Sequence, residues 1–158
     1  MNDYKILSYF FLIFFMPLNI FCEIKISSTN FVYFKSSMVN VRSGPGKIYP
    51  VKWVYQVKGM PMQVLDKFDN WFYIRDIDGD VGWVFHAMVV EKYFKALTIR
   101  NGEIRKNYSK KSKVIAKVER LSLVNIKKCS VDFCLIEVSN IRGWIDKDIL
   151  WGLHYHFQ

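Results

Sequence analysis

The sequence contains one short pattern twice, and the second copy follows the first at a nearly constant spacing. Arg105 lies 63 residues after Arg42. The triplet Gly143-Trp144-Ile145 lies 61 residues after Gly82-Trp83-Val84, a slip of two residues that one shortened hairpin would explain. A repeat of this length predicts two similar modules in one chain rather than a single larger domain.

Short β-strands separated by turn residues account for most of the first copy. Residues 51–55 and 71–75 are rich in β-branched and aromatic residues, and Asp78-Gly79 is a two-residue hairpin signal ahead of residues 81–85. The Ser-Gly-Pro-Gly sequence of residues 43–46 cannot continue a strand or a helix, so a loop is expected there. Five short strands with tight turns predict a small, highly curved barrel.

The second copy keeps this order of strands with different residues. Strands are expected at residues 114–118, 121–126 and 135–138, and Ser139-Asn140 makes a shortened turn. The loop at residues 106–113 has lost the Gly-Pro-Gly sequence. The second module is therefore a divergent version of the first.

A resemblance to the bacterial SH3-like domain family rests on three phrases of the first copy: Val39-Asn40-Val41-Arg42-Ser43-Gly44-Pro45-Gly46, then Tyr49-Pro50-Val51, and finally Gly82-Trp83-Val84. With its repeat, the chain is similar to the two-module exported SH3 domain-containing proteins of Gram-negative bacteria. This resemblance implies an all-β fold of tandem small SH3-like β-barrels, with five to six short strands each. It also implies an absence of catalysis and a role in holding a ligand of the cell envelope.

The N-terminus carries a short apolar run at residues 6–20, preceded by Lys5. The run is shorter than the roughly 20 residues that span a bilayer, so it predicts a secretory signal helix within residues 1–22, and a permanent membrane anchor is the alternative. Lipidation of Cys22 is disfavoured because Phe21 is not the small residue that such processing needs. The protein is therefore expected in the periplasm or outside the cell.

The signal and the repeat together divide the chain into six segments. These are a signal peptide (1–22), a lead-in segment (23–37), the first barrel (38–90), a short joint (91–102), the second barrel (103–150) and a C-terminal tail (151–158). The joint is too short and too apolar for a flexible linker. We expect the barrels to dock, with residues 150–153 packed between or against them.

Positive charge is concentrated in the second copy. The chain has a net charge of +9, of which residues 91–158 carry +7, and such an excess attracts anionic polymers or surfaces. The candidate basic surface consists of Lys106, Lys110, Lys111 and Lys113, for which ordinary solvated surface is the alternative. Export argues against a nucleic-acid partner, and nothing in the sequence indicates a small-molecule substrate.

Two cysteines flank a four-residue segment of the second copy. In an exported chain, Cys129 and Cys134 predict a disulfide across the mouth of a β-hairpin. A zinc site needs four ligands, and the redox pattern Cys-x-x-Cys is absent from the sequence. No metal and no cofactor is therefore expected.

Aromatic residues of the first copy outnumber what a small barrel can bury. Trp83 and Trp144 are expected as core plugs, whereas exposed aromatic rings suit sugar rings or extended peptides. Arg42 either donates to a ligand carboxylate or holds its own loop by donating to backbone carbonyls. The candidate ligand-binding residues are Arg42, Tyr49, Trp53, Tyr55, Trp71 and Tyr73.

No catalytic residue is proposed, because an enzyme needs a nucleophile, a base and an orienting group within reach of one another. The sequence favours a non-catalytic cell-envelope binding protein whose modules recognise peptidoglycan or a peptidoglycan-associated protein. The alternative is a secreted or surface-exposed interaction module that binds polypeptide partners.

Overall fold

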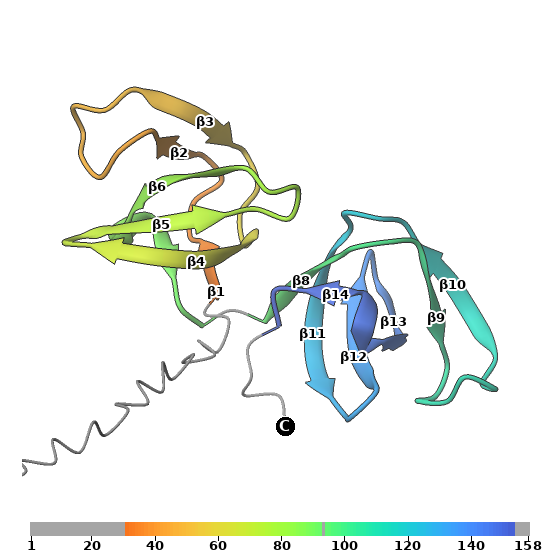
Figure 1. Ribbon diagram of the computed structural model, residues 1–158. Coiled ribbons are helices and arrows are strands. Elements are labelled where there is room, and N and C mark those ends of the chain that lie inside the picture. The colour runs from red at the N-terminus through yellow and green to blue at the C-terminus, as the bar shows by residue number, and fades with distance from the viewer. Residues whose placement is uncertain (1–30, 93, 154–158) are drawn as a thin grey trace, which may run out of the picture.

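The computed structural model describes residues 31–92 and 94–153 and shows an all-β chain arranged as two modules (Figure 1). Each module is a seven-stranded antiparallel sheet that curls around its own core. Among the described residues the helical elements are two short 3-10 turns, and no helix is long and apolar enough to cross a membrane. The predicted signal helix at residues 1–22 lies outside the described residues.

The first module has the strand order β3-β2-β6-β5-β4-β1-β7. Its elements are β1 (Phe31–Phe34), β2 (Val39–Arg42), β3 (Val51–Tyr55), β4 (Pro61–Phe68), β5 (Trp71–Arg75), β6 (Val81–Phe85), the 3-10 turn η1 (His86–Met88) and β7 (Val89–Val90). The core is made by inward-facing side chains such as Phe34, Val41 and Ile74.

The second module repeats this order, strand for strand, as β10-β9-β13-β12-β11-β8-β14. Its elements are β8 (Lys95–Thr98), β9 (Gly102–Arg105), β10 (Val114–Val118), β11 (Leu123–Cys129), β12 (Phe133–Val138), β13 (Ile141–Asp146), the 3-10 turn η2 (Lys147–Ile149) and β14 (Leu150–Trp151). Arg42 pairs with Trp83 across β2 and β6, and Arg105 pairs with Trp144 across β9 and β13. The repeat in sequence is therefore also a repeat of strand pairing. The expected pair of SH3-like barrels is confirmed, with seven strands in each sheet instead of the predicted five to six.

The slip of two residues between the copies does not arise in a single hairpin. Tyr73 pairs with Trp83, and Leu135 pairs with Trp144, which sets β5 and β12 62 residues apart. One residue is therefore lost before β12, and the second is lost in the turn between β12 and β13.

The structure differs from the sequence expectation where each module begins. Residues 31–34, placed in the lead-in segment at 23–37, form β1, and residues 95–98, placed in the joint at 91–102, form β8. Both strands lie inside their sheets, where β1 pairs with β4 and β7 and β8 pairs with β11 and β14. All four residues of β1 and the last three of β8 are buried, so these strands lack the alternation that marks a half-buried strand.

The modules dock through β1 of the first and the C-terminal segment of the second. The Tyr33 hydroxyl donates to the carbonyl oxygen of Gly152 (2.7 Å), and the Phe31 ring meets the Trp151 ring edge-on with centroids 4.9 Å apart. Burial raises the pKa of Tyr33 to about 12, so its hydroxyl remains a donor at neutral pH. The expected packing of residues 150–153 against the barrels is thus observed.

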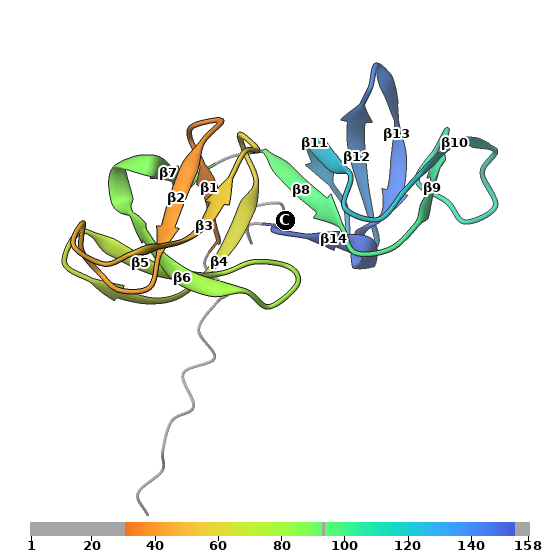
Figure 2. The same ribbon diagram turned by 90° about the horizontal axis from the view of Figure 1, so that it is seen from above.

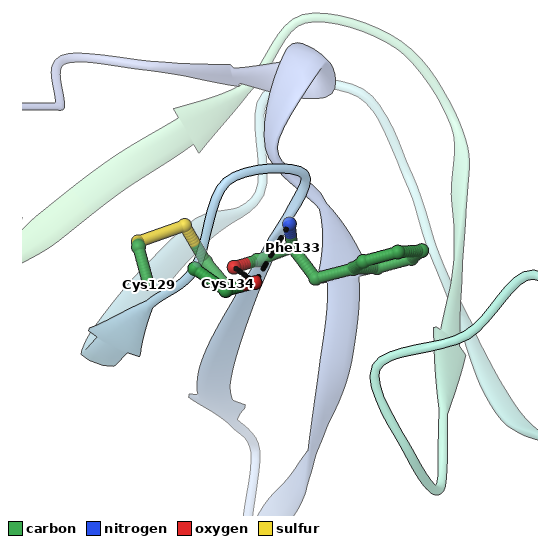
Figure 3. The surroundings of a disulfide bond; sticks show 4 residues. Cys129, Phe133 and Cys134 are labelled. Atoms are coloured by element: carbon green, nitrogen blue, oxygen red, sulfur yellow. Dashed lines mark hydrogen bonds between the residues drawn. A yellow bond between two sulfur atoms is a disulfide. The ribbon is translucent and has the colours of Figure 1, made fainter. Parts of the chain in front are cut away.

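Cys129 and Cys134 form the predicted disulfide between opposed residues of β11 and β12 (Figure 3). Their Cα atoms are 4.0 Å apart, close to the spacing of a non-hydrogen-bonded antiparallel pair. The first module has Lys67 and Phe72 as the matching opposed pair, with the Lys67 ammonium 4.7 Å from the Phe72 ring centroid. A covalent bond in one module therefore occupies the place of a cation–π contact in the other.

Two glycines with positive φ provide a test of the docking. Gly152 has φ +91° and its missing Cβ would collide with the Pro61 ring, whereas Gly79 has φ +97° and open space around it. Alanine at either position costs about 1 kcal/mol for the left-handed backbone, and Gly152→Ala adds about 2 kcal/mol of overpacking. We expect urea unfolding, followed by tryptophan fluorescence, to show a clearly larger loss for Gly152→Ala than for Gly79→Ala.

Equal losses for the two variants would contradict the docking of the C-terminal segment against the first module.

Candidate functional site

Two cross-strand aromatic pairs cover the outer face of β5 and β6. Trp71 lies opposite Phe85 with ring centroids 5.4 Å apart, and Tyr73 lies opposite Trp83 with centroids 5.0 Å apart. All four side chains are half-buried, because each ring covers its neighbour. These pairs form the aromatic face of the first module.

The expectation that Trp83 and Trp144 are core plugs is wrong. Successive strand residues point to opposite faces of a sheet, and the glycine before each tryptophan is the residue that faces inward. A Cβ on Gly82 would lie 2.5 Å from Val41 Cγ1, and one on Gly143 would be equally close to Ile104 Cγ2. The tryptophans therefore lie on the outer face.

A groove of about 300 Å³ lies beside the aromatic face. Its lining residues come from β2 and the residue before it, the β2–β3 loop, β5, β6 and η1, and they are Met38, Asn40, Arg42, Lys47, Trp71, Phe85 and Met88. The walls are apolar, and the charged groups of the lining are two cations. In the described part of the chain, neither Arg42 nor Lys47 forms a salt bridge.

Arg42 is anchored to the β2–β3 loop as well as lining the groove. Its Nη1 donates to the Tyr49 carbonyl oxygen (2.7 Å), and Arg105 Nη1 donates to the Ser112 carbonyl oxygen (3.0 Å) at the matching place of the second module. This geometry supports the loop-holding interpretation. It leaves Arg42 with further N–H donors, because a guanidinium group carries five.

The Gly-Pro-Gly loop is shaped by the ring of Tyr49. A Cβ on Gly44 would lie 2.5 Å from Tyr49 Cδ1, and one on Gly46 would lie 3.3 Å from Tyr49 Cδ2. Gly44 and Gly46 are absent from the residues with positive φ. These glycines are therefore required for space beneath an aromatic ring, and not for a left-handed backbone.

The second module keeps the loop backbone without any glycine. Ser109 N donates to Asn107 O (2.9 Å), as Gly46 N donates to Gly44 O (3.0 Å) in the first module. Ser112 replaces the tyrosine, and its hydroxyl accepts a hydrogen bond from Asn107 N (2.9 Å). Once the ring is gone, the space that glycine supplied is no longer needed.

The structure brings only some of the predicted ligand-binding residues together. Arg42 and Trp71 line the groove, and Tyr73 belongs to the adjoining aromatic face. Tyr49 and Trp53 are 41% and 37% exposed on the β2–β3 loop and on β3, away from the groove lining.

The Tyr55 side chain packs toward the interior of the first module. Its hydroxyl donates to Asp76 Oδ2 (2.9 Å), and its ring packs on Phe34 with centroids 5.2 Å apart. Burial, reinforced by the hydrogen bond to Asp76, raises the pKa of Tyr55 well above its ordinary value. Its hydroxyl is therefore not offered to a ligand.

Asp76 was not singled out by the sequence analysis, although it organises the β5–β6 loop. Its Oδ1 accepts hydrogen bonds from the backbone N–H groups of Asp78 (3.0 Å) and Asp80 (2.8 Å). The prediction of a two-residue hairpin at Asp78-Gly79 is wrong. Arg75 pairs with Val81, which leaves a five-residue loop that Asp76 organises. An Asp whose side chain caps its own loop is typical of turns.

Five groove residues were not among the predicted ligand-binding residues: Met38, Asn40, Lys47, Phe85 and Met88. Phe85 could have been found, since it shares the outward alternation of Trp83 on β6. The two methionines come from segments flanking β2 and β6, and only tertiary structure places them together.

The second module has a groove at the matching place, with different chemistry. Lys110, Phe133 and Asp146 occupy the positions that Lys47, Trp71 and Phe85 hold in the first module. The remaining lining residues are polar apart from Val131, and they include Asp132 and an ion pair between Arg100 and Asp148. The apolar character of the groove belongs to the first module alone.

The basic candidates Lys106, Lys110, Lys111 and Lys113 lie together on the exposed β9–β10 loop. Among the described residues no group of three His, Cys, Asp or Glu side chains is placed to hold a metal ion. His86 packs against Phe85 with ring centroids 4.7 Å apart, which places it on the same outer surface as the aromatic face.

Comparison with known proteins finds one sequence family. Residues 35–90 match the family model described as bacterial SH3 domain. No curated protein matches the chain.

Two of the solved structures that are similar to the chain come from one organism. They are NlpC2 from Trichomonas vaginalis (16% identity, 78% of this chain and 48% of that chain, TM-score 0.36) and NlpC1 from the same organism (14% identity, 77% and 45%, TM-score 0.36). The chain spans about half the length of these structures.

The pairing of Gly44 with Tyr49 can be tested by a double-mutant cycle. Gly44→Ala forces the Tyr49 ring to move, so we expect it to lower the free energy of unfolding by about 2 kcal/mol. In a Tyr49→Ser background, which copies the second module, the same change should cost less than about 0.5 kcal/mol. Urea unfolding of the four proteins measures the coupling, and additive losses would contradict the steric explanation.

Proposed function

We propose that this chain is a non-catalytic binding protein of the cell envelope, because residues 35–90 match the family model described as bacterial SH3 domain. Its first module recognises peptidoglycan or a peptidoglycan-associated protein. The family match supports this assignment, and the exported character predicted from the N-terminal sequence agrees with it.

The groove beside the aromatic face is the observation that carries the proposal. Apolar walls from Trp71 and Phe85 accept aliphatic side chains or the apolar face of a sugar ring. Arg42 and Lys47 stand at the same groove without a carboxylate partner among the described residues. This combination fits an extended ligand with a free carboxylate, such as a peptidoglycan stem peptide.

The docking of the two modules leaves this groove open. The docking contacts use β1, the start of β4, the C-terminal segment and the ion pair between Arg120 and Asp78 of the β5–β6 loop. Trp71 and Phe85 of the groove lie at the opposite ends of β5 and β6 from this loop, so the second module supports the first without covering its groove.

Co-sedimentation with purified sacculi tests the groove. We expect Trp71→Ala to reduce retention of the protein at least about tenfold, as for a central aromatic contact. Trp53→Ala removes an exposed ring of the same module outside the groove, and should change retention less than about twofold. Circular dichroism and urea unfolding verify that both variants are folded.

Wild-type protein that fails to sediment with sacculi at any salt concentration would overturn recognition of peptidoglycan itself. Equal losses for the two variants would overturn the groove as its location.

A second candidate function, binding of polypeptide partners, is favoured by the edge strand β3. It ends the first sheet, and its side chains Val51, Trp53 and Val54 are 42%, 37% and 52% exposed. An apolar edge with unpaired backbone groups can accept an added strand from another polypeptide. β3 contains Lys52, whereas the matching edge strand β10 contains Lys117 and is also flanked by Lys113.

Photo-crosslinking in living cells distinguishes this second function. A photoreactive residue at Val54 should give discrete protein adducts, whereas one at Ile115, the exposed apolar residue of β10, should not. Val51→Lys should abolish the adducts, because a charge on the edge opposes strand addition. Adducts of equal yield from both edge strands would contradict a specific role for β3.

A further inference from the structure

The cations of the second module divide into two groups. Three arginines of the second module are ion-paired: Arg100 with Asp148, Arg105 with Glu103, and Arg120 with Asp78 of the first module. Lys127 likewise pairs with Glu137. Several cations have no carboxylate within 4.0 Å among the described residues, among them Lys128, Arg142 and Lys147. Five of these cations are exposed lysines that follow one another closely in the sequence: Lys106, Lys110, Lys111, Lys113 and Lys117.

These five lysines follow one continuous path. Four lie on the β9–β10 loop, which projects at the end of the module away from the first module (Figures 1 and 2). Lys117 continues the path along β10, an edge strand of the sheet. At about 3.3 Å per strand residue, Lys113 and Lys117 are about 13 Å apart along β10. We call this path the lysine stripe.

The loop that carries the stripe is held by its own hydrogen bonds. Lys106 N donates to Lys113 O (3.0 Å), Asn107 N to Ser112 Oγ (2.9 Å) and Lys111 N to Ser109 Oγ (3.3 Å). An ordered backbone keeps the ammonium groups near one another, and their mutual repulsion is unfavourable unless anions offset it. Glu103, Glu137 and Asp148 are ion-paired, and Asp132 and Asp146 line the groove, so an anionic ligand on the loop would offset this repulsion.

An aromatic group stands in the middle of the stripe. Tyr108 is 66% exposed and packs against Trp144 with ring centroids 5.3 Å apart, while the Lys128 ammonium lies 5.4 Å from the Trp144 ring centroid. Trp144 therefore supports the Tyr108 ring, and much of that ring remains exposed. An aromatic ring held in place among lysines can stack on a sugar ring that carries a negatively charged group.

We propose that the lysine stripe is a second binding site, for a linear anionic polysaccharide. The elongated arrangement matches a chain with regularly spaced carboxylates or phosphates. An anionic membrane fits less well, because Tyr108 is the one aromatic residue of the loop, and the other non-lysine residues, Asn107, Ser109 and Ser112, offer no apolar anchor.

Protection of the edge strand accounts for only part of the stripe. Lysines at β10 discourage edge-to-edge pairing, and this explains Lys113 and Lys117. It does not explain Lys106, Lys110 and Lys111, which lie on the loop and not on the strand. Asp132 and Asp146 line the groove of the second module together with Tyr108 and Lys110, so their negative charge favours a polyanion on the outer side of the loop.

Binding of the full chain to polygalacturonate, measured by calorimetry over a salt series, tests the site. The variant Lys106→Gln/Lys111→Gln/Lys113→Gln should bind at least about tenfold more weakly with a shallower salt dependence, since fewer counterions are released. The matched control Lys35→Gln/Lys58→Gln/Lys67→Gln removes the same charge from exposed lysines of the first module, and should change the Kd less than about twofold.

Tyr108→Ala separates a sugar ligand from other polyanions. It should weaken binding to polygalacturonate several-fold and leave binding to poly-glutamate unchanged. Equal losses in both lysine variants would overturn the proposal, because net charge alone would then explain the affinity. Tighter binding to vesicles of anionic phospholipid than to the polysaccharide would also overturn it, in favour of a membrane surface.

Discussion

The close approach of β6 to β2 at Gly82, and of β13 to β9 at Gly143, is the contact on which the rest of each module depends. A Cβ on Gly82 would lie 2.9 Å from the Arg42 carbonyl oxygen, and one on Gly143 would lie 2.8 Å from the Arg105 carbonyl oxygen. Only glycine allows the strands to meet so closely, and this meeting lets the sheet curl over its core. Because side chains alternate along a strand, the inward glycine also sends the next tryptophan outward.

The outward tryptophan then determines what each module can offer to a ligand. In the first module, Trp83 lies against Tyr73 and extends the aromatic surface formed by Trp71 and Phe85. In the second, Trp144 supports Tyr108 and lies beneath Lys128. The same backbone register therefore presents an apolar face in one module and a basic one in the other.

The two modules show how far chemistry can change while the backbone bonds persist. The arginine of β2 and its counterpart of β9 hold the following loop through the same carbonyl position, although one loop contains a tyrosine over two glycines and the other a serine over none. A disulfide likewise takes the place of the Lys67–Phe72 contact. Substitutions of this kind are coupled, because replacing one residue of a contacting pair removes the steric or electrostatic reason for the other residue.

The sequence by itself determined the repeat, most strand positions, the disulfide and the uneven charge, because each depends on spacing, local turn chemistry or composition. Strands 51–55, 71–75, 81–85 and 114–118 have the predicted bounds. Tertiary structure alone decided that β1 and β8 belong to the sheets, that both tryptophans face outward, and which aromatic residues line the groove. The physical reason is that burial on both faces erases the periodicity of β1 and β8, whereas the groove joins side chains from five separate segments whose distances are fixed only when the sheet curls.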